Sequence, residues 1–252
     1  MASESDEKMS APRTVVTLPT YNESENIGEL VAALRALGCE VLVADDNSPD
    51  GTWKIVEAMA AEDDGVHLLL RKEKKGRGYA GAEAFVEALK LKADRIVEMD
   101  ADFSHRPDDL PKLLAALDAG AHVVVGSRFV EGGKDDRPQA SRQWLTRFSA
   151  FYARKLLGVQ MRDTNSGYRA YTAYAMKLIE PKTLRSAGPS IVHEVLLRAH
   201  RRGLRIVEVP ILFVDRERGE SQLTLGRLIQ GFIMVAKFRR LAERGLLWST
   251  DG

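Results

Sequence analysis

The chain has 252 residues, 44% of them hydrophobic, which is enough to bury a substantial core in one α/β domain. Its 37 lysines and arginines nearly balance 36 aspartates and glutamates, so the net charge of +1 gives no overall field that would attract nucleic acid. A single cysteine, Cys39, excludes an intramolecular disulfide and every metal site built from several cysteines, and it fits a reducing compartment.

Short β-like runs alternate with helical segments along most of the chain. Strands are predicted at residues 14–19, 40–46, 66–70, 95–102 and 122–126. A helix is predicted after each of the first four, and Asn22 with Glu25 has the spacing of a capping box that would begin the first helix. This alternation predicts a Rossmann-like, mostly parallel sheet with helices on both faces.

In such a sheet, ligands bind at the carboxyl ends of the strands. The segment 19–23, the pair Asp45 and Asp46, and the pair Asp100 and Asp102 are all predicted to lie along that rim. No Gly-x-Gly-x-x-Gly follows the first strand, which argues against a dinucleotide-dependent dehydrogenase. An aromatic ring and carboxylates at this edge suit a nucleoside, although the start of a helix explains Tyr21 and Glu23 equally well.

Asp100 and Asp102 are the strongest single feature of the rim. A strand places residues i and i+2 on one side, so these carboxylates are predicted to face one point. Mg²⁺ is commonly held by one or two carboxylates together with substrate phosphates. Alone, an Asp-Ala-Asp triplet is more often a solvated strand end, and it gains weight only from its neighbours on the rim.

Several motifs together resemble family-2 glycosyltransferases, and more narrowly polyprenyl- or dolichyl-phosphate mannosyltransferases. They span about residues 13 to 240 and lie at 19–23, 45–52, 100–102, 126–128, 163–169 and 213–221. The resemblance implies a GT-A fold, GDP-mannose as donor, Mg²⁺ or Mn²⁺ as cofactor, and inverting transfer to a polyprenyl or dolichyl phosphate. Two alternatives stay open: glucosyl transfer from a UDP-sugar, and a non-catalytic nucleotide-sugar-binding partner of a membrane subunit.

The same resemblance implies a set of site residues. Those for the nucleotide sugar are Pro19, Tyr21, Glu23, Ala44, Asp46, Asp100, Ala101, Asp102, Ser104, Arg128, Arg216 and Gln222. Asp102 would be the direct metal ligand, with Asp100 beside it. Ser104 stands where the family often has Gln, and Gln222 replaces the usual Lys of a closing loop that carries Arg216. The loss of that lysine puts in doubt how tightly the loop clamps the diphosphate.

The acceptor phosphate would contact Arg128, Arg142 and Thr146, with Thr in place of the usual Ser. Asp102, Arg128 and Arg216 are the predicted catalytic residues. A phosphate monoester has a second pKa of about 6 and is already largely ionised at neutral pH, so the reaction requires no general base.

Six further polar positions carry weaker expectations. Asp163, Asn165 and Tyr168 are candidate sugar contacts, although a polar turn explains the motif as well. His105 could support the metal motif from behind it. The pair His193 and Glu194, in a helix predicted over residues 190–202, is expected to serve packing and solvation.

Two segments have the pattern of amphipathic helices, residues 143–157 and 223–244. Each combines aromatic or aliphatic residues at helical spacing with flanking basic residues, which suits either a membrane interface or packing on the sheet. The expected organisation is a tail at 1–12, a GT-A domain at 13–222, and an amphipathic interface helix with its tail at 223–252. The expected location is peripheral, at the cytoplasmic face of a membrane, where a small anchoring subunit is a candidate partner.

Overall fold

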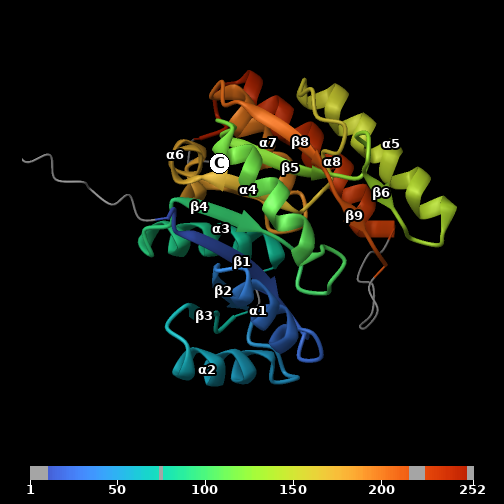
Figure 1. Cartoon of the computed structure of the whole chain (residues 1–252). Coiled ribbons are helices and arrows are strands. Elements are labelled where there is room, and N and C mark those ends of the chain that lie inside the picture. The colour runs from blue at the N-terminus through green and yellow to red at the C-terminus, as the bar shows by residue number, and fades with distance from the viewer. Residues whose placement is uncertain (1–10, 74–75, 216–224, 249–252) are drawn as a thin grey trace, which may run out of the picture.

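The computed structural model describes residues 11–73, 76–215 and 225–248, and a seven-stranded sheet runs through the molecule (Figure 1). The strand order is β3-β2-β1-β4-β7-β5-β8. Their bounds are β1 Thr14–Thr20, β2 Glu40–Asp45, β3 Val66–Leu70, β4 Arg95–Glu98, β5 Val123–Ser127, β7 Arg169–Thr172 and β8 Ile206–Pro210. A two-stranded parallel sheet joins β6 (Lys134–Asp135) to β9 (Leu212–Phe213).

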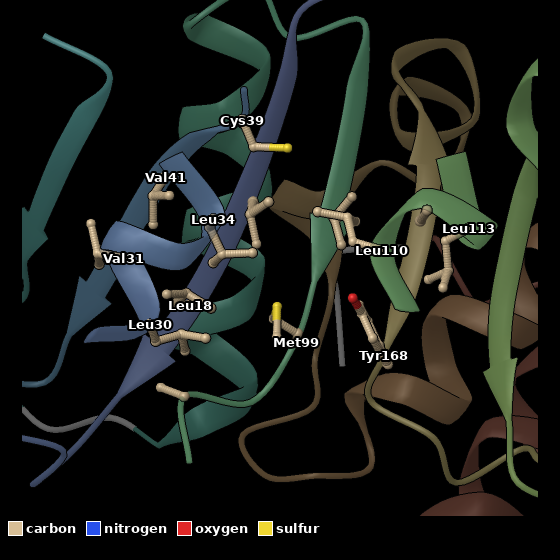
Figure 2. Close-up of a cluster of buried hydrophobic side chains, with 14 of the residues drawn as sticks. Leu18, Leu30, Val31, Leu34, Cys39, Val41, Met99, Leu110, Leu113 and Tyr168 are labelled. Atoms are coloured by element: carbon tan, nitrogen blue, oxygen red, sulfur yellow. The ribbon is translucent and has the colours of Figure 1, made fainter. Parts of the chain in front are cut away.

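Helices cover both faces of the sheet, as predicted. Their bounds are α1 Ile27–Ala36, α2 Thr52–Glu62, α3 Arg77–Lys90, α4 Leu110–Asp118, α5 Ala140–Leu157, α6 Ala173–Ile179, α7 Ile191–Arg201 and α8 Leu225–Glu243, with short 3₁₀ helices at Pro107–Asp109 and Pro181–Thr183. Alternate residues of β1 point to opposite faces. Leu18 packs in the cluster with α1 and α4 (Figure 2), whereas Val15 packs in the cluster with α3 and α7.

The sheet is mostly parallel, with one exception. β7 lies between β4 and β5 and is antiparallel to both. Neither β7 nor β8 was predicted from the sequence. The structure also shows that β4 ends at Glu98, so the prediction of a strand through Asp102 was wrong. Asp100 and Asp102 lie in the loop that follows, where Phe103 has a left-handed φ of 58°, and strand alternation does not orient them.

The predicted capping box was also wrong. Asn22 adopts a left-handed φ of 61° and lies four residues ahead of Asn26, the N-cap of α1. The backbone N–H of Asn22 donates to the Ser48 hydroxyl at 3.0 Å, so this segment ties to the next loop instead of starting a helix. The Glu23 carbonyl accepts from the N–H groups of Asn26 and Ile27 and forms the turn that leads into α1.

A third cluster joins α5, α7 and α8 at the end of the molecule opposite to α2 (Figure 1). Val235 and Phe238 of α8 are buried there with Ala153 and Leu157 of α5. Cys39 is buried between α1 and β2. Among the described residues, no helix is both long and apolar enough to span a bilayer.

Candidate functional site

The loops after β1 and β2 meet at the carboxyl edge of the sheet. Pro19 pairs with Ala44 across the two strands, and the N–H of Glu23 donates to the hydroxyl of Thr52 at the start of α2. These bonds fix the course of the segment that carries Tyr21 and Glu23. Four of the five positions predicted for the nucleoside therefore lie together at this edge: Pro19, Tyr21, Glu23 and Ala44.

Asp45 and Asp46, although adjacent, have different partners. Asp45 is fully buried and accepts from the hydroxyls of Thr20 and Ser48, both at 2.7 Å. Asp46 is also buried and forms an ion pair with Arg71, which follows β3. Burial raises the pKa of Asp46, and the charge of Arg71 offsets this only in part. The predicted contact of Asp46 with a nucleoside stays a prediction, since its carboxylate engages an arginine that sequence reasoning did not single out.

Asp100 and Asp102 have distinct surroundings. Asp100 forms an ion pair with Arg77 at the start of α3, and its side chain is one-third exposed. Asp102 is buried, and its Oδ1 accepts from the backbone N–H and the hydroxyl of Ser104 at 3.1 and 2.6 Å. Ser104 thus orients the Asp102 carboxylate, whereas Arg77 engages that of Asp100. Ala101 between them is buried.

His105 supports this loop from behind, as expected. Its Nδ1 accepts from the backbone N–H of Asp100 at 3.0 Å, and its ring stacks on Tyr168 with centroids 5.1 Å apart. Burial lowers the pKa of His105 despite the nearby carboxylates of Asp100 and Asp102. The neutral ring can therefore accept this bond and hold the loop in place.

The two aspartates fit a divalent cation that is shared with a substrate. Within the described residues, no three His, Cys, Asp or Glu side chains form a complete metal site. Mg²⁺ is usually held by one or two carboxylates and completes its shell with waters and phosphate oxygens. A buried, oriented Asp102 beside Asp100 matches that mode, and Asp102 is the better candidate for direct coordination because Arg77 engages Asp100.

Arg128 follows β5 and makes a buried, bidentate ion pair. Its Nε and one terminal nitrogen donate to the two oxygens of Asp163 at 2.7 and 2.8 Å. Burial lowers the pKa of Arg128, but the charge and hydrogen bonds of Asp163 outweigh that effect, so its pKa is raised. Asp163, a candidate sugar contact, therefore serves to hold Arg128, which is only 7% exposed.

A second arginine, Arg137, completes this side of the site. It pairs with Asp135 at 2.6 Å and donates to the Thr146 hydroxyl at 3.0 Å. The Thr146 hydroxyl also donates to the backbone carbonyl of Arg142 at 2.8 Å, and Arg142 itself is exposed. Sequence reasoning missed Arg137, because no motif marks it and its partner Thr146 lies in another element.

Phe213 of β9 links the acidic and basic sides. Its ring centroid lies 5.5 Å from that of His105, and 5.0 and 5.3 Å from the guanidinium carbons of Arg128 and Arg137. The backbone N–H of Val214 donates to the carbonyl of Ser104 at 3.3 Å. The loop that carries Asp102 is therefore joined to the strand on which the arginines pack.

The other candidate residues face the interior. The Asn165 amide donates to Ser149 at 2.6 Å and its oxygen shares a hydrogen bond with His193 Nε2 at 2.9 Å. Tyr168 is buried, and its hydroxyl donates to the carbonyl of Arg106 at 3.2 Å. Glu194 pairs with Arg198 inside the core, in keeping with the packing role expected of it. The predicted positions Arg216 and Gln222 lie outside the described residues.

Comparison with known proteins decides the family. Residues 15–179 match the model of glycosyl transferase family 2. The chain belongs to this family.

Curated relatives align over most of the chain. An undecaprenyl-phosphate mannosyltransferase from Micrococcus luteus is 41% identical over 90% of this chain and 93% of its own length. A polyprenol monophosphomannose synthase from Mycolicibacterium smegmatis is 38% identical over 90% of this chain and 86% of its own length. A dolichol-phosphate mannosyltransferase from Pyrococcus furiosus is 34% identical over 82% of this chain and 58% of its own length.

Solved structures of lower identity share the fold. Glucosyl-3-phosphoglycerate synthase from Mycobacterium tuberculosis superposes with a TM-score of 0.67 at 20% identity, over 90% of this chain and 79% of its own. Mannosyl-3-phosphoglycerate synthase from Rubrobacter xylanophilus gives a TM-score of 0.66 at 17% identity, over 94% and 77%. These likenesses confirm the predicted GT-A-like fold.

Proposed function

We propose that the protein transfers mannose from GDP-mannose to a polyprenyl monophosphate of the undecaprenyl or dolichyl type, with inversion at the sugar carbon and with Mg²⁺ or Mn²⁺ as cofactor. The observation that carries the proposal is Phe213, whose ring contacts the guanidinium groups of Arg128 and Arg137 and also His105, which supports the loop of Asp100 and Asp102. Three relatives that are 34–41% identical bear names that specify this acceptor class and this sugar.

The acceptor side has the chemistry of a phosphate site. Arginine presents a planar fork of donors that matches a phosphate group. Arg142 is exposed and follows Arg137, while Thr146 adds a hydroxyl one turn along α5. Arg128 is held by Asp163, so this pair adds a fixed dipole at the end of β5 more than a second full positive charge.

The proposed reaction needs positioning more than proton transfer. An ionised phosphate oxygen of the acceptor attacks the anomeric carbon of mannose, and the bond from that carbon to the nucleoside diphosphate breaks with its electron pair on the departing oxygen. No proton has to be removed from the acceptor, because its second pKa is about 6. The arginines hold the acceptor near the sugar, and this use of binding energy raises the effective concentration of the reacting groups.

The donor would lie along the rim formed by β1, β2 and the loop after β4. In this arrangement Tyr21 and Glu23 would meet the nucleoside, and Asp100 and Ala101 would meet the ribose and diphosphate. When bound, a divalent cation at Asp102 would neutralise negative charge on the departing diphosphate. Complexes of the Mycobacterium tuberculosis relative contain Mn²⁺, which supports the use of a divalent metal by this fold. Arg216 and Gln222 stay proposed diphosphate contacts.

The surface of α5 and α8 supports a peripheral position on a membrane. Trp144 and Phe148 stack with centroids 5.6 Å apart and are 67% and 47% exposed. Ile233 of α8 is 61% exposed, and Phe232 beside it packs edge-on against Tyr152 of α5 at 4.9 Å. Exposed aromatic residues of this kind suit the interface between lipid headgroups and acyl chains. We place this surface on the cytoplasmic face, where a small membrane subunit could add to the attachment.

Transfer can be tested with the purified chain, radiolabelled GDP-mannose, a short polyprenyl phosphate and Mg²⁺ or Mn²⁺. The expected product is an acid-labile mannosyl-phosphoryl lipid that disappears when a chelator is added. Binding of GDP-mannose without product would instead identify a nucleotide-sugar-binding partner. Product from a UDP-sugar alone would contradict the assignment of the donor.

A further inference from the structure

Three arginines outside the proposed transfer site line one cavity. Arg147 and Arg154 of α5 and Arg162 of the following loop surround a space of about 430 Å³, together with Phe129, Val130 and Phe151. In the part of the chain that the structure describes, none of these three arginines forms an ion pair with a carboxylate. Arg128 also borders the space, but Asp163 already neutralises its charge. The cavity is therefore strongly cationic, in a chain whose net charge is +1.

Aromatic rings hold these cations in place. The guanidinium carbon of Arg147 lies 5.6 Å from the centroid of Phe129, and that of Arg154 lies 5.7 Å from the centroid of Phe151. Contact with a ring limits the freedom of a long side chain and leaves its donors available to an anion. Spacings of four and three residues place Arg147, Phe151 and Arg154 on one side of α5.

An apolar hollow adjoins the cationic cavity and shares Phe151 with it. It measures about 350 Å³ and is lined by Phe148, Phe151, Tyr152 and Leu156, with Lys155 at its edge. One ligand could therefore place an anionic group among the arginines and a hydrocarbon chain beyond Phe151. Arg128, a proposed acceptor contact, borders the cationic cavity, but neither cavity includes Phe213, Arg142 or Thr146, the other residues around which the proposed acceptor site is built.

We propose that this twin cavity binds an anionic phospholipid of the bilayer, with its phosphodiester on Arg147, Arg154 and Arg162 and one acyl chain in the apolar hollow. Arginine forks match phosphate oxygens, and the charge of the cavity complements a headgroup such as phosphatidylglycerol. The bound lipid would fix the orientation of α5 at the membrane. The inference rests on the proposed function only for the presence of a membrane, because binding of the lipid requires no turnover.

The test uses a soluble lipid, so that attraction to a charged surface does not enter. Dihexanoyl phosphatidylglycerol is titrated below its critical micelle concentration into the full chain, followed by calorimetry or by ¹⁵N NMR. We expect saturable binding that weakens about tenfold or more in R147Q/R154Q/R162Q, because each basic residue contributes appreciably to the attraction of an anionic lipid. The matched control, K237Q/R240Q/R244Q, makes the same change in charge on exposed positions of the α8 segment and should bind as wild type does.

Four results would overturn the proposal. Two concern affinity: an equal loss of affinity for the lipid in the two triple variants, or an affinity for dihexanoyl phosphatidylcholine equal to that for the phosphatidylglycerol. The others are full competition by inorganic phosphate at the same concentration, and a rise in the KM for a short polyprenyl phosphate in R147Q/R154Q/R162Q. The last would assign the arginines to the acceptor. If the triple variant does not fold, the three single glutamine variants are titrated instead, and unchanged binding in all three would also contradict the site. Failure of mannose transfer in the wild-type chain would leave these binding results intact, so the two proposals fail separately.

Discussion

The two ends of the sheet differ in the surroundings of their charged side chains. At the β1–β2–β4 end, carboxylates are buried or half-buried and each has a defined partner: Thr20 and Ser48 for Asp45, Arg71 for Asp46, and Arg77 for Asp100. At the α5–α8 end, the exposed Arg147 lies beside the half-buried ring of Phe129, and the half-buried Arg154 lies beside the exposed ring of Phe151. The first arrangement suits a small polar ligand that arrives from water, and the second suits an anion attached to a lipid.

At the boundary between these regions, Phe213 packs against the buried Arg128–Asp163 ion pair. A buried ion pair that loses one partner leaves an uncompensated charge. Arg128→Gln should therefore lower the free energy of unfolding by about 3–5 kcal/mol and reduce transfer as well. Urea denaturation measures the first effect. If Arg128→Gln unfolded at the wild-type urea concentration, the pair would not be the structural link described above.

A double variant separates stability from chemistry at this boundary. Arg128→Leu with Asp163→Leu removes both charges and should recover much of the lost stability, because no buried charge then stands alone. Transfer should stay impaired, since the acceptor side has lost its fixed dipole. Recovery of activity together with stability would show that Arg128 acts only through folding.

On the acidic side, Asp102→Asn should lower kcat/KM by about 10²–10³-fold, the range expected when a group that stabilises transition-state charge is lost. The amide keeps the shape of the carboxylate, so the denaturation midpoint should change little. Ser104→Ala is the matched control, since it removes only the hydroxyl that orients Asp102 and should cost about tenfold. Unchanged product formation in Asp102→Asn would refute the metal assignment.

His193 makes the interior behind the acceptor side sensitive to acid. Its Nδ1 is buried and has no hydrogen-bond partner among the described residues. Burial, followed by the charge of Arg169, lowers the pKa of His193 to about 3. Below pH 6.5, His193 binds a proton in the unfolded chain but stays neutral in the folded chain. The free energy of unfolding therefore falls as the pH falls, by about 2 kcal/mol between pH 7 and pH 5.

Replacing His193 by Gln should remove that part of the pH dependence, as measured by denaturation at pH 5 and pH 7. The matched variant His200→Gln, at an exposed position of the same helix, should keep the wild-type slope. If the free energy of unfolding changed equally with pH in the wild type, His193→Gln and His200→Gln, the assignment to His193 would be contradicted.

Arg142 tests whether the exposed arginine of the basic side meets the acceptor. Arg142→Gln should raise the KM for a polyprenyl phosphate about tenfold, because a charge-assisted hydrogen bond contributes about 1.5–3 kcal/mol at most. The KM for GDP-mannose should not change. A larger rise in the KM for GDP-mannose than in the KM for the polyprenyl phosphate would assign Arg142 to the donor site instead.

The smallest effects are expected at the exposed rings. Trp144→Ala with Phe148→Ala should leave stability within about 0.5 kcal/mol of wild type, as is usual for surface positions. Partitioning onto phospholipid vesicles should fall severalfold, as measured by sedimentation. Leu37→Ala with Tyr174→Ala removes two other exposed apolar side chains, 44% and 60% exposed, and should leave partitioning unchanged. If both double variants partitioned onto vesicles equally, α5 would not be part of the membrane-binding surface.

Local patterns in the sequence predicted strands β1 to β5 to within a few residues and the mostly parallel sheet. They did not predict β7, because its four residues follow a motif that reads as a turn and its antiparallel pairing with β4 and β5 is a long-range choice. The ion pairs of the site could not be predicted from the sequence for a similar reason. Arg71 lies 25 residues from Asp46, and Arg128 lies 35 residues from Asp163, so no local spacing in the sequence indicates these ion pairs.

The positions taken from family motifs have different surroundings in the structure. Asp102 and Ser104 come together in the loop after β4, which local sequence placed at the correct edge for the wrong reason, since that loop and not a strand orients them. Asp163 was a candidate sugar contact, and its carboxylate holds Arg128, because a buried arginine side chain needs a carboxylate partner.

We propose that donor and acceptor meet where the acidic and basic regions join at Phe213. The most direct measurement is a panel of donors and acceptors with the purified chain: GDP-mannose and UDP-glucose, each with a short polyprenyl phosphate or the corresponding free alcohol, in Mg²⁺ or Mn²⁺. We expect a mannosyl-phosphoryl lipid only from the combination of GDP-mannose and the polyprenyl phosphate. Transfer to the alcohol, or from UDP-glucose only, would contradict it.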